Sequence, residues 1–294
     1  MTDSIRARAI ALYDRYTHEG MDRRAFMAEL SRIAGGTAAA NALLLGIAAN
    51  PAAAAIVPED DPRLQARSLQ WELIPGRKMS GYGAAPVDAA ANVATVVVIH
   101  ENRGLNDHIR DVARRVALAG FSAVAPDFLS PVGGTPADEN QAREMIGKLD
   151  LAATVADGRA FIDWLSSTAG GARKVGAVGF CWGGGMVNRL AVAAGAKLKA
   201  GVPFYGPAPD PLEAPKVQAP MLIQLAGNDE RVNRTALPWI DALKAAGKTV
   251  TGHVYEGVEH AFHNDTSVER YNKAAADLAW QRTIDFLKRH LATT

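Results

Sequence analysis

The chain has few of the features that mark several common classes of protein. It contains a single cysteine among 294 residues, which excludes an internal disulfide framework and gives no reason to expect a cysteine-based metal site. Its formal net charge is +1 and 6% of its residues are aromatic, without a dense basic stripe, which argues against a nucleic-acid partner. Its seven histidines show no H-E-x-x-H pattern. We therefore expect neither a bound metal nor a cofactor.

The first 58 residues differ in composition from the rest of the chain. Arg23 and Arg24 begin the sequence Arg-Arg-Ala-Phe-Met, which resembles a twin-arginine export motif, and residues 33–58 contain no charged side chain. Residues 52–55 are alanines and contain a small-x-small cleavage pattern. The pattern predicts a signal recognised by the twin-arginine export machinery, and hence a periplasmic or otherwise exported protein.

The same region also fits a helical arm that is retained. Apolar residues recur with helical spacing at Phe26, Leu30 and Ile33 within residues 13–34, and the two glycines at 35–36 can end such a helix. An arm of this kind packs on its own domain or on the partner of a homodimer, in a protein that stays in the cytoplasm. The sequence leaves both interpretations open.

Beyond residue 63, strand-like and helix-like segments alternate. Residues 94–100 form a nearly continuous β-branched run, which is typical of a strand buried on both faces. Further strands are expected at 69–74, 122–126, 174–180, 200–205, 221–226 and 250–255, and helices at 107–119, 137–149, 153–166, 186–194, 236–246 and 271–291. This alternation predicts one α/β domain over residues 63–294, with a mostly parallel central sheet flanked by helices on both faces.

The single cysteine follows one of these strands in the sequence Gly-Phe-Cys-Trp-Gly-Gly-Gly. This is the G-x-C-x-G form of the nucleophile elbow, a strained strand-to-helix turn. Gly179 and Gly183 remove side chains that would clash beside Cys181. The N-terminus of the next helix favours a thiolate. A buried structural cysteine is the alternative, but this frame favours a nucleophile.

A cysteine nucleophile needs a base, and the base needs a carboxylate that orients it. Asp229 and His260 each follow an expected strand, at the edge of a parallel sheet where sites form. Glu230 and His263 are the competing acid and base. The chain order of nucleophile, acid and histidine is that of the α/β-hydrolases, so we predict that Cys181, Asp229 and His260 form a triad.

Acyl transfer also needs two donors for the oxyanion that develops in the transition state. The backbone amide of Trp182 is one candidate, and Asn102, in the loop after residues 94–100, supplies the second. Glu101 and Arg103 flank that residue, either with a role in the site or as a solvated charge pair.

At these positions the sequence resembles the dienelactone hydrolase family, or carboxymethylenebutenolidases, of the α/β-hydrolase superfamily, over about residues 69–291. The similarity rests on the elbow and on His100-Glu101-Asn102-Arg103-Gly104, Val202-Pro203-Phe204-Tyr205-Gly206, Asp229 and His260-Ala261-Phe262. The resemblance implies an α/β-hydrolase fold. It also implies attack by the cysteine of the triad on an ester or lactone carbonyl, a thioester intermediate, and its release by water.

The resemblance implies roles for further residues. Glu101 would contact the nucleophile and help to switch it on, and the oxyanion donors would be the backbone amides already named. Four residues are expected at the substrate: Arg103, Tyr205, Phe262 and Asn264.

One position departs from the family pattern. Members that act on dienelactone have an arginine four residues beyond the catalytic histidine, where this chain has Asn264, and Arg143 is only a candidate for their second arginine. The expected activity is therefore hydrolysis of a small ester or lactone, without a commitment to dienelactone. A general carboxylesterase and a non-catalytic protein that binds a small molecule are the alternatives. A role as a redox sensor is disfavoured, because the chain has no second cysteine that could act as the resolving residue.

Overall fold

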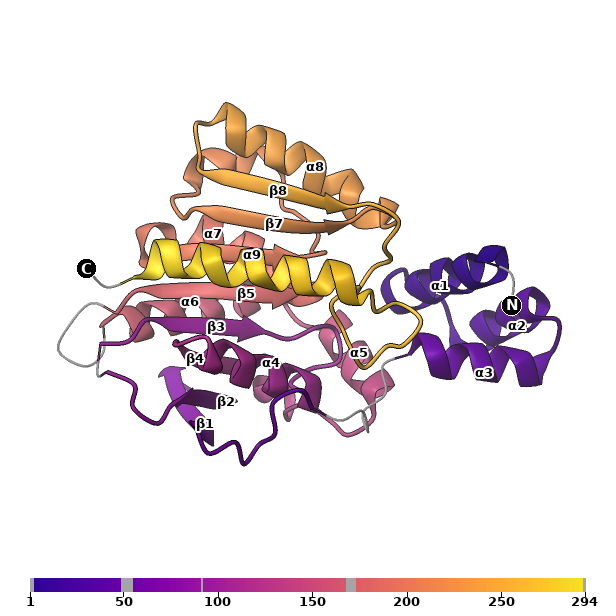
Figure 1. The fold of residues 1–294 in the computed structure, drawn as a ribbon, viewed down its shortest axis with the longest axis horizontal. Helices are drawn as coiled ribbons and strands as arrows, with labels where there is room; N and C mark the ends of the chain where they lie inside the picture. The colour runs from indigo at the N-terminus through magenta and orange to yellow at the C-terminus, as the bar shows by residue number, and fades with distance from the viewer. Residues whose placement is uncertain (1–2, 49–54, 91, 168–172, 293–294) are drawn as a thin grey trace.

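The computed structural model describes residues 3–48, 55–90, 92–167 and 173–292. Its centre is an eight-stranded sheet in the order β1-β2-β4-β3-β5-β6-β7-β8 (Figure 1). The strands are β1 (Leu64–Ile74), β2 (Arg77–Pro86), β3 (Thr95–Ile99), β4 (Ser122–Asp127), β5 (Val175–Phe180), β6 (Leu198–Phe204), β7 (Met221–Ala226) and β8 (Val250–Tyr255). β2 is antiparallel to β1 and β4, and the pairs from β4 to β8 are parallel. The expected α/β class is confirmed.

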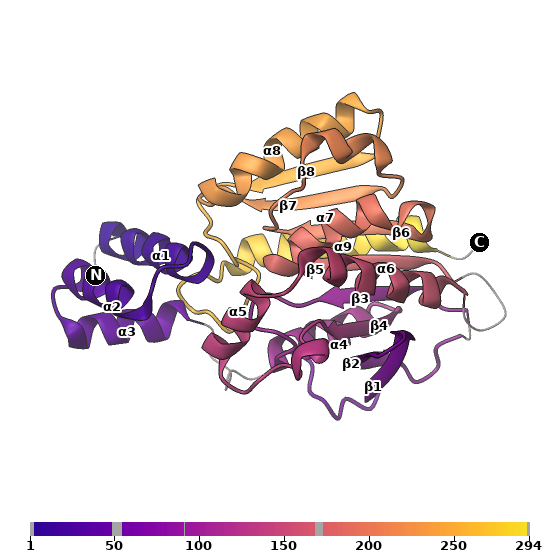
Figure 2. The ribbon, with the colours of Figure 1, turned by 180° about the vertical axis from the view of Figure 1, so that it is seen from behind.

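Helices cover both faces of this sheet (Figures 1 and 2). One face holds α4 (Asp107–Leu118) and α9 (Lys273–Leu291), and the other holds α6 (Leu151–Ser167), α7 (Trp182–Ala193) and α8 (Glu230–Ala245). The shorter helices are α5 (Glu139–Gly147), η1 (Ser130–Val132), η2 (Gly195–Lys197) and η3 (Pro211–Lys216). Within β3, Val96 and Val98 pack into the first core and Val97 and Ile99 into the second. Both faces need apolar side chains, which explains the unbroken β-branched run.

The first two strands form a hairpin that the sequence predicted only in part. The edge strand expected at 69–74 begins at Leu64, and β2 was not expected. β2 lacks a clear alternating pattern because it contains Gly81 and Gly83. A Cβ on Gly81 would lie 2.6 Å from the carbonyl oxygen of Ala125, so this strand can approach β4 only without a side chain there.

Two helices begin earlier than expected. α7 begins at Trp182 instead of residue 186, although three glycines occupy its first turn. α8 begins at Glu230 instead of residue 236, and the Asp229 side chain caps it by accepting a hydrogen bond of 3.0 Å from the Val232 amide. Both helices therefore start directly after the candidate site residues.

The described residues 3–47 form three helices, which we call the cap: α1 (Asp3–His18), α2 (Arg23–Ala34) and α3 (Thr37–Ile47). The single helix expected over residues 13–34 is wrong, because α1 ends at His18 and Asp22 begins a new helix. The Asp22 carboxylate accepts hydrogen bonds of 2.9 Å from the amides of Arg24 and Ala25. The end predicted at the glycines is confirmed, with Gly35 at a φ of 81°.

The cap lies beyond the carboxyl ends of the parallel strands, beside the loop that precedes α9 (Figure 1). At the end of α3, the Ile47 carbonyl accepts hydrogen bonds from Ser267 Oγ at 2.6 Å and Arg270 Nε at 3.0 Å. The cap also has a small apolar core of its own, centred on Leu12, Phe26 and Leu30. It is therefore anchored to the α/β domain through buried polar contacts.

The prediction of export stays a prediction. Most of the expected cleavage segment, residues 52–54, lies outside the described residues. No single described helix has both the length and the apolar character needed to cross a membrane. α2 and α3 meet that criterion only as a pair, and they are bent by 106° relative to each other.

Candidate active site

Cys181 occupies a strained turn between β5 and α7. Its φ of 54° and ψ of −114° are unusual for a residue with a side chain. A Cβ on Gly179 would overlap the carbonyl of Gly183, and a Cβ on Gly183 would overlap the carbonyl of Ile99. The glycines are thus required because backbone passes on both sides of the turn. The turn places the thiol at the N-terminus of a twelve-residue helix, which is the positive end of the helix dipole.

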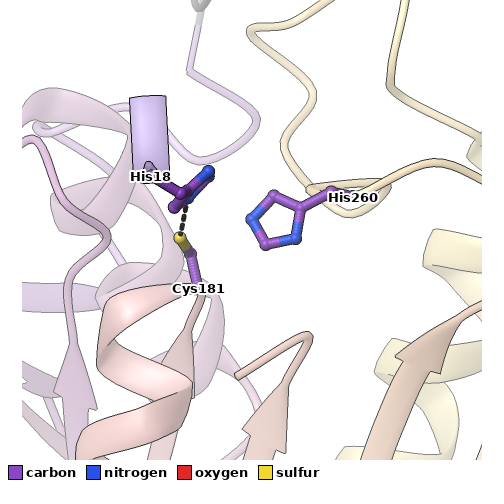
Figure 3. A group of neighbouring side chains, drawn as sticks. All are labelled: His18, Cys181 and His260. Carbon is purple, nitrogen blue, oxygen red and sulfur yellow. Dashed lines mark hydrogen bonds between the residues drawn. The ribbon is translucent and has the colours of Figure 1, made fainter. Parts of the chain in front are cut away.

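Asp229 and His260 meet beside this thiol. His260 Nδ1 lies 2.5 Å from Asp229 Oδ2, and both side chains are buried. With Nδ1 engaged, His260 Nε2 is buried without a hydrogen-bond partner among the described residues. A ring nitrogen of His260 lies within 4.8 Å of Cys181 Sγ, and the ring faces the thiol in Figure 3. The ends of β5, β7 and β8 therefore bring together the three residues of the predicted triad.

The electrostatics of this group favour a charged imidazole. Burial alone would lower the pKa of His260, but the charges of Asp229 and Cys181 outweigh burial and raise that pKa to about 10. Burial likewise opposes ionisation of Asp229, yet the neighbouring His260 lowers the pKa of this carboxyl. The arrangement is suited to an imidazolium between two negative groups.

The two competing residues lie elsewhere. Glu230 is exposed in the first turn of α8. The His263 ring is buried against Phe180 and Phe204, with centroids 5.2 and 5.1 Å apart. Burial lowers the pKa of His263 to about 3, so it is a neutral histidine of the core.

The expected oxyanion donors belong to two residues that line a cavity together with Cys181. The Trp182 amide belongs to the first turn of α7, where amides lack partners within the helix. Among the described residues, neither this amide nor that of Asn102 has a hydrogen-bond acceptor. The Asn102 side chain donates instead to the Thr17 carbonyl of the cap, at 3.3 Å. Two backbone amides without an acceptor therefore belong to residues that line this cavity.

Glu101 is buried and held by residues that were expected at the substrate. Its Oε2 accepts a hydrogen bond of 2.8 Å from Asn264 Nδ2, and its Oε1 accepts one of 3.5 Å from the Tyr205 hydroxyl. In the part of the chain that the structure describes, no hydrogen bond joins Glu101 to Cys181. Asn264, where the sequence departs from the pattern expected for action on dienelactone, therefore fixes this carboxylate.

Two other expected substrate residues have different surroundings. Arg103 donates hydrogen bonds to Glu139 and to the Tyr13 hydroxyl of the cap. Phe262 is fully buried, and its ring lies 5.5 Å from that of Tyr205 and 5.0 Å from that of Tyr255. Arg103 thus holds the cap and Phe262 belongs to the core.

A cavity of about 310 Å³ opens beside Cys181. It is lined by Thr17, His18, Asn102, Arg143, Ile146, Gly147, Leu149, Leu151, Thr154, Cys181, Trp182, Pro207 and Arg231. Arg143 uses Nη1 to donate a hydrogen bond of 2.6 Å to the Tyr16 carbonyl. The Nε and Nη2 atoms of Arg231 are buried without partners among the described residues. The Nε atom of Arg143 is likewise buried without a partner among these residues, so Arg231 offers two free donor atoms to the cavity and Arg143 offers one.

His18, at the end of α1, is a site residue that the sequence did not predict. Its Nε2 lies 3.2 Å from Cys181 Sγ, as Figure 3 shows. Its Nδ1 lies 2.9 Å from the Asp14 carbonyl, which can only accept, so the ring proton is on Nδ1. Burial and the nearby His260 charge hold the pKa of His18 well below its usual value.

His18 and Arg231 differ in how far the sequence could have pointed to them. His18 is 163 residues from Cys181 in a segment of different composition, and no local pattern connects them. Arg231 stands two residues after Asp229, at the start of a helix on the same sheet edge. Its place beside the predicted acid could therefore have identified Arg231 as a candidate site residue.

Known proteins resemble this chain in both sequence and structure. A model of the dienelactone hydrolase family matches residues 79–291. A "Putative carboxymethylenebutenolidase" of Escherichia coli is 31% identical over 263 residues, covering 83% of this chain and 94% of the relative. One of the same name from Saccharolobus solfataricus is 31% identical, covering 73% and 95%. A structure described as a putative dienelactone hydrolase from Klebsiella pneumoniae has a TM-score of 0.67 at 28% identity, covering 76% and 99%. The cap lies outside the residues that the family model matches.

Proposed function

The chain belongs to the dienelactone hydrolase family and is an ester or lactone hydrolase, and from this premise we propose that Cys181, His260 and Asp229 are its catalytic triad. The observation that carries the proposal is the unpartnered, buried Nε2 of His260, beside the thiol, on a ring oriented by Asp229. A general base that is oriented by a carboxylate and adjacent to a nucleophile is the arrangement that acyl transfer needs.

The reaction follows from these positions. The Cys181 thiolate attacks the carbonyl carbon, and the amides of Asn102 and Trp182 stabilise the oxyanion. His260 donates its Nε2 proton to the leaving alkoxide as the C–O bond breaks, which leaves a thioester and a neutral imidazole. The imidazole then accepts a proton from water, the resulting hydroxide attacks the thioester, and the carboxylic acid leaves as thiolate is restored.

The cavity supports a small substrate. Its volume of about 310 Å³ is at the lower end of ligand pockets. The free donors of Arg231 favour a substrate with an acceptor or an anionic group on that side. The Asn264 side chain donates a hydrogen bond to Glu101, so it gives no reason to assign dienelactone itself as the substrate.

Substitution of the nucleophile tests the proposal. Cys181→Ala should reduce hydrolysis of an activated p-nitrophenyl ester by several orders of magnitude, because no other thiol is present to form the thioester. Cys181→Ser should retain weak activity, because a hydroxyl is the poorer nucleophile in this site. Turnover by Cys181→Ala at the wild-type rate would refute the assignment. Parallel assays of a lactone and of an open-chain ester identify the preferred substrate.

A further inference from the structure

We propose that His18, Cys181 and His260 form a binding site for a thiophilic divalent metal ion, with Zn²⁺ as the reference ion. One potential ligand atom from each side chain lies within 4.8 Å of the other two. Figure 3 shows the three side chains converging from the cap, from the elbow and from the loop after β8. The proposed hydrolytic reaction needs only one histidine, so it leaves the position of His18 unexplained.

The ligand set matches the chemistry of zinc. One thiolate and two neutral imidazoles form a borderline-soft donor set, and sites with three protein ligands leave a fourth position for water. Zn–S and Zn–N bonds of about 2.3 and 2.0 Å at a tetrahedral centre separate sulfur from nitrogen by about 3.5 Å. The observed distance from His18 Nε2 to Cys181 Sγ is 3.2 Å. For this pair of ligand atoms, a shift of a few tenths of an ångström gives the separation that zinc requires.

The second ring nitrogen of each histidine also has a hydrogen-bond partner of the kind found at metal sites. Metal-binding histidines usually donate the other ring proton to a carboxylate or a backbone carbonyl. His18 Nδ1 meets the Asp14 carbonyl at 2.9 Å, and His260 Nδ1 meets the Asp229 carboxylate at 2.5 Å. With Nδ1 engaged in both histidines, Nε2 is the atom left for the metal, and His260 releases its Nε2 proton when the ion binds. The buried, unpartnered His260 Nε2 is thus a free ligand atom directed into the cluster.

The groups around the three ligands balance the local charge and leave space for a fourth ligand on the metal ion. The Asp229 carboxylate contacts His260, and with the thiolate it offsets the positive charges of Arg231 and Arg270, which act on His18. The cavity beside Cys181 provides room for a water molecule on the metal. These features complete a four-coordinate site.

A metal at this position would have two consequences. It would occupy the thiol and the imidazole together, so it would inhibit the hydrolase, a consequence that rests on the proposed function. It would also join the cap to the α/β domain, because His18 belongs to α1 and the other ligands do not. His18 lies outside residues 79–291, so the site depends on the additional N-terminal segment of this chain.

The decisive experiment is a Co²⁺ titration of the full-length, thiol-reduced protein. Cobalt bound to a thiolate gives a charge-transfer absorption band in the near ultraviolet, which reports the metal without any measurement of activity. We expect one equivalent to bind and Zn²⁺ to displace it. Cys181→Ala should abolish the band, and His18→Ala should weaken binding by more than about 100-fold, the upper range for loss of a supporting group alone.

Matched variants make the titration specific. His18→Gln keeps a polar side chain of similar size in the cap and should lose affinity as His18→Ala does. His290→Ala alters a histidine in the last turn of α9 and should bind as the wild type does. The absence of the band in the wild type, or equal affinity in both His18 variants and the wild type, would overturn the site.

Activity measurements separate this proposal from the catalytic one. Zn²⁺ should inhibit ester hydrolysis by the wild type at lower concentration than by His18→Gln. If the protein hydrolyses no ester but shows the cobalt band, the metal site stands and the catalytic proposal fails. If the protein hydrolyses esters but lacks the band, the catalytic proposal stands and the metal site fails. The experiments require a chain that retains its N-terminus, which intact-mass measurement of the native protein establishes.

Discussion

Arg143 is the side chain through which the docking of the cap can be measured. It extends from α5, and its Nη1 donates a hydrogen bond of 2.6 Å to the Tyr16 carbonyl in α1. Its guanidinium also lies over the Tyr16 ring, 4.2 Å from the centroid. Arg143→Ala removes both contacts and leaves the α/β core unchanged.

The expected magnitude follows from these two contacts. A hydrogen bond to a charged group contributes about 1.5–3 kcal/mol, and a cation–π contact contributes about 0.5–2 kcal/mol. Arg143 is only half-buried, which favours the lower end of each range, about 2 kcal/mol together. The equilibrium between docked and open cap should therefore shift toward the open form by about 30-fold, because ~1.4 kcal/mol corresponds to a factor of ten.

Amide hydrogen exchange with mass spectrometry is the assay. Peptides from α1 should exchange about 30-fold faster in Arg143→Ala, while peptides from β3 and β5 keep their protection. Arg15→Ala is the matched control. Arg15 is also near the end of α1, but its guanidinium bonds Glu29 within the cap, at 3.0 Å.

Two results would refute the reasoning. Unchanged exchange of α1 in Arg143→Ala would show that the cap does not depend on this contact. Equal acceleration in α1 and in the central strands would show global unfolding in place of cap opening.

Two further predictions concern the elbow and the triad. Gly183→Ala should lower the urea midpoint of unfolding and abolish ester hydrolysis, because its Cβ would overlap the Ile99 carbonyl. The control Gly147→Ala should not lower that midpoint, because nothing lies within 4 Å of a Cβ there. Equal midpoints for the two variants would contradict the packing argument. Since the pKa of His260 is raised to about 10, the stability contributed by its charged form is complete below the unfolded pKa of about 6.5 and is lost as the pH rises through about 10. The thermal midpoint of the wild type should therefore fall over that interval more than the midpoint of His260→Gln, and parallel curves would disprove the stabilising role of the imidazolium.

The parts of the site that could be predicted depend on short stretches of sequence. The β-branched run of β3 reports burial on both faces of a strand, and the glycines around Cys181 report a turn without room for side chains. Asp229 and His260 follow strands, and parallel strands end at one edge of the sheet, so their proximity could also be expected.

The misplaced boundaries have a common physical cause. β2 contains Gly81 and Gly83, and the first turn of α7 contains three glycines, so local propensity argues against both elements. These segments adopt their conformation because neighbouring backbone approaches too closely for any side chain. At Gly81 the neighbour is the carbonyl of Ala125 in β4. Tertiary packing overrides propensity there.

By itself, the sequence determined the parallel part of the sheet, the strained cysteine turn and the chain order of the three residues of the proposed triad, because each depends on local pattern or on the shared edge of parallel strands. Only the tertiary structure decided that α1 closes over this edge and brings His18 to within 3.2 Å of Cys181. It also decided that Asn264 bonds Glu101 and that Arg103 holds the cap. Contacts between segments far apart in the chain have no local signature. They form only where helices pack and buried polar groups must find partners.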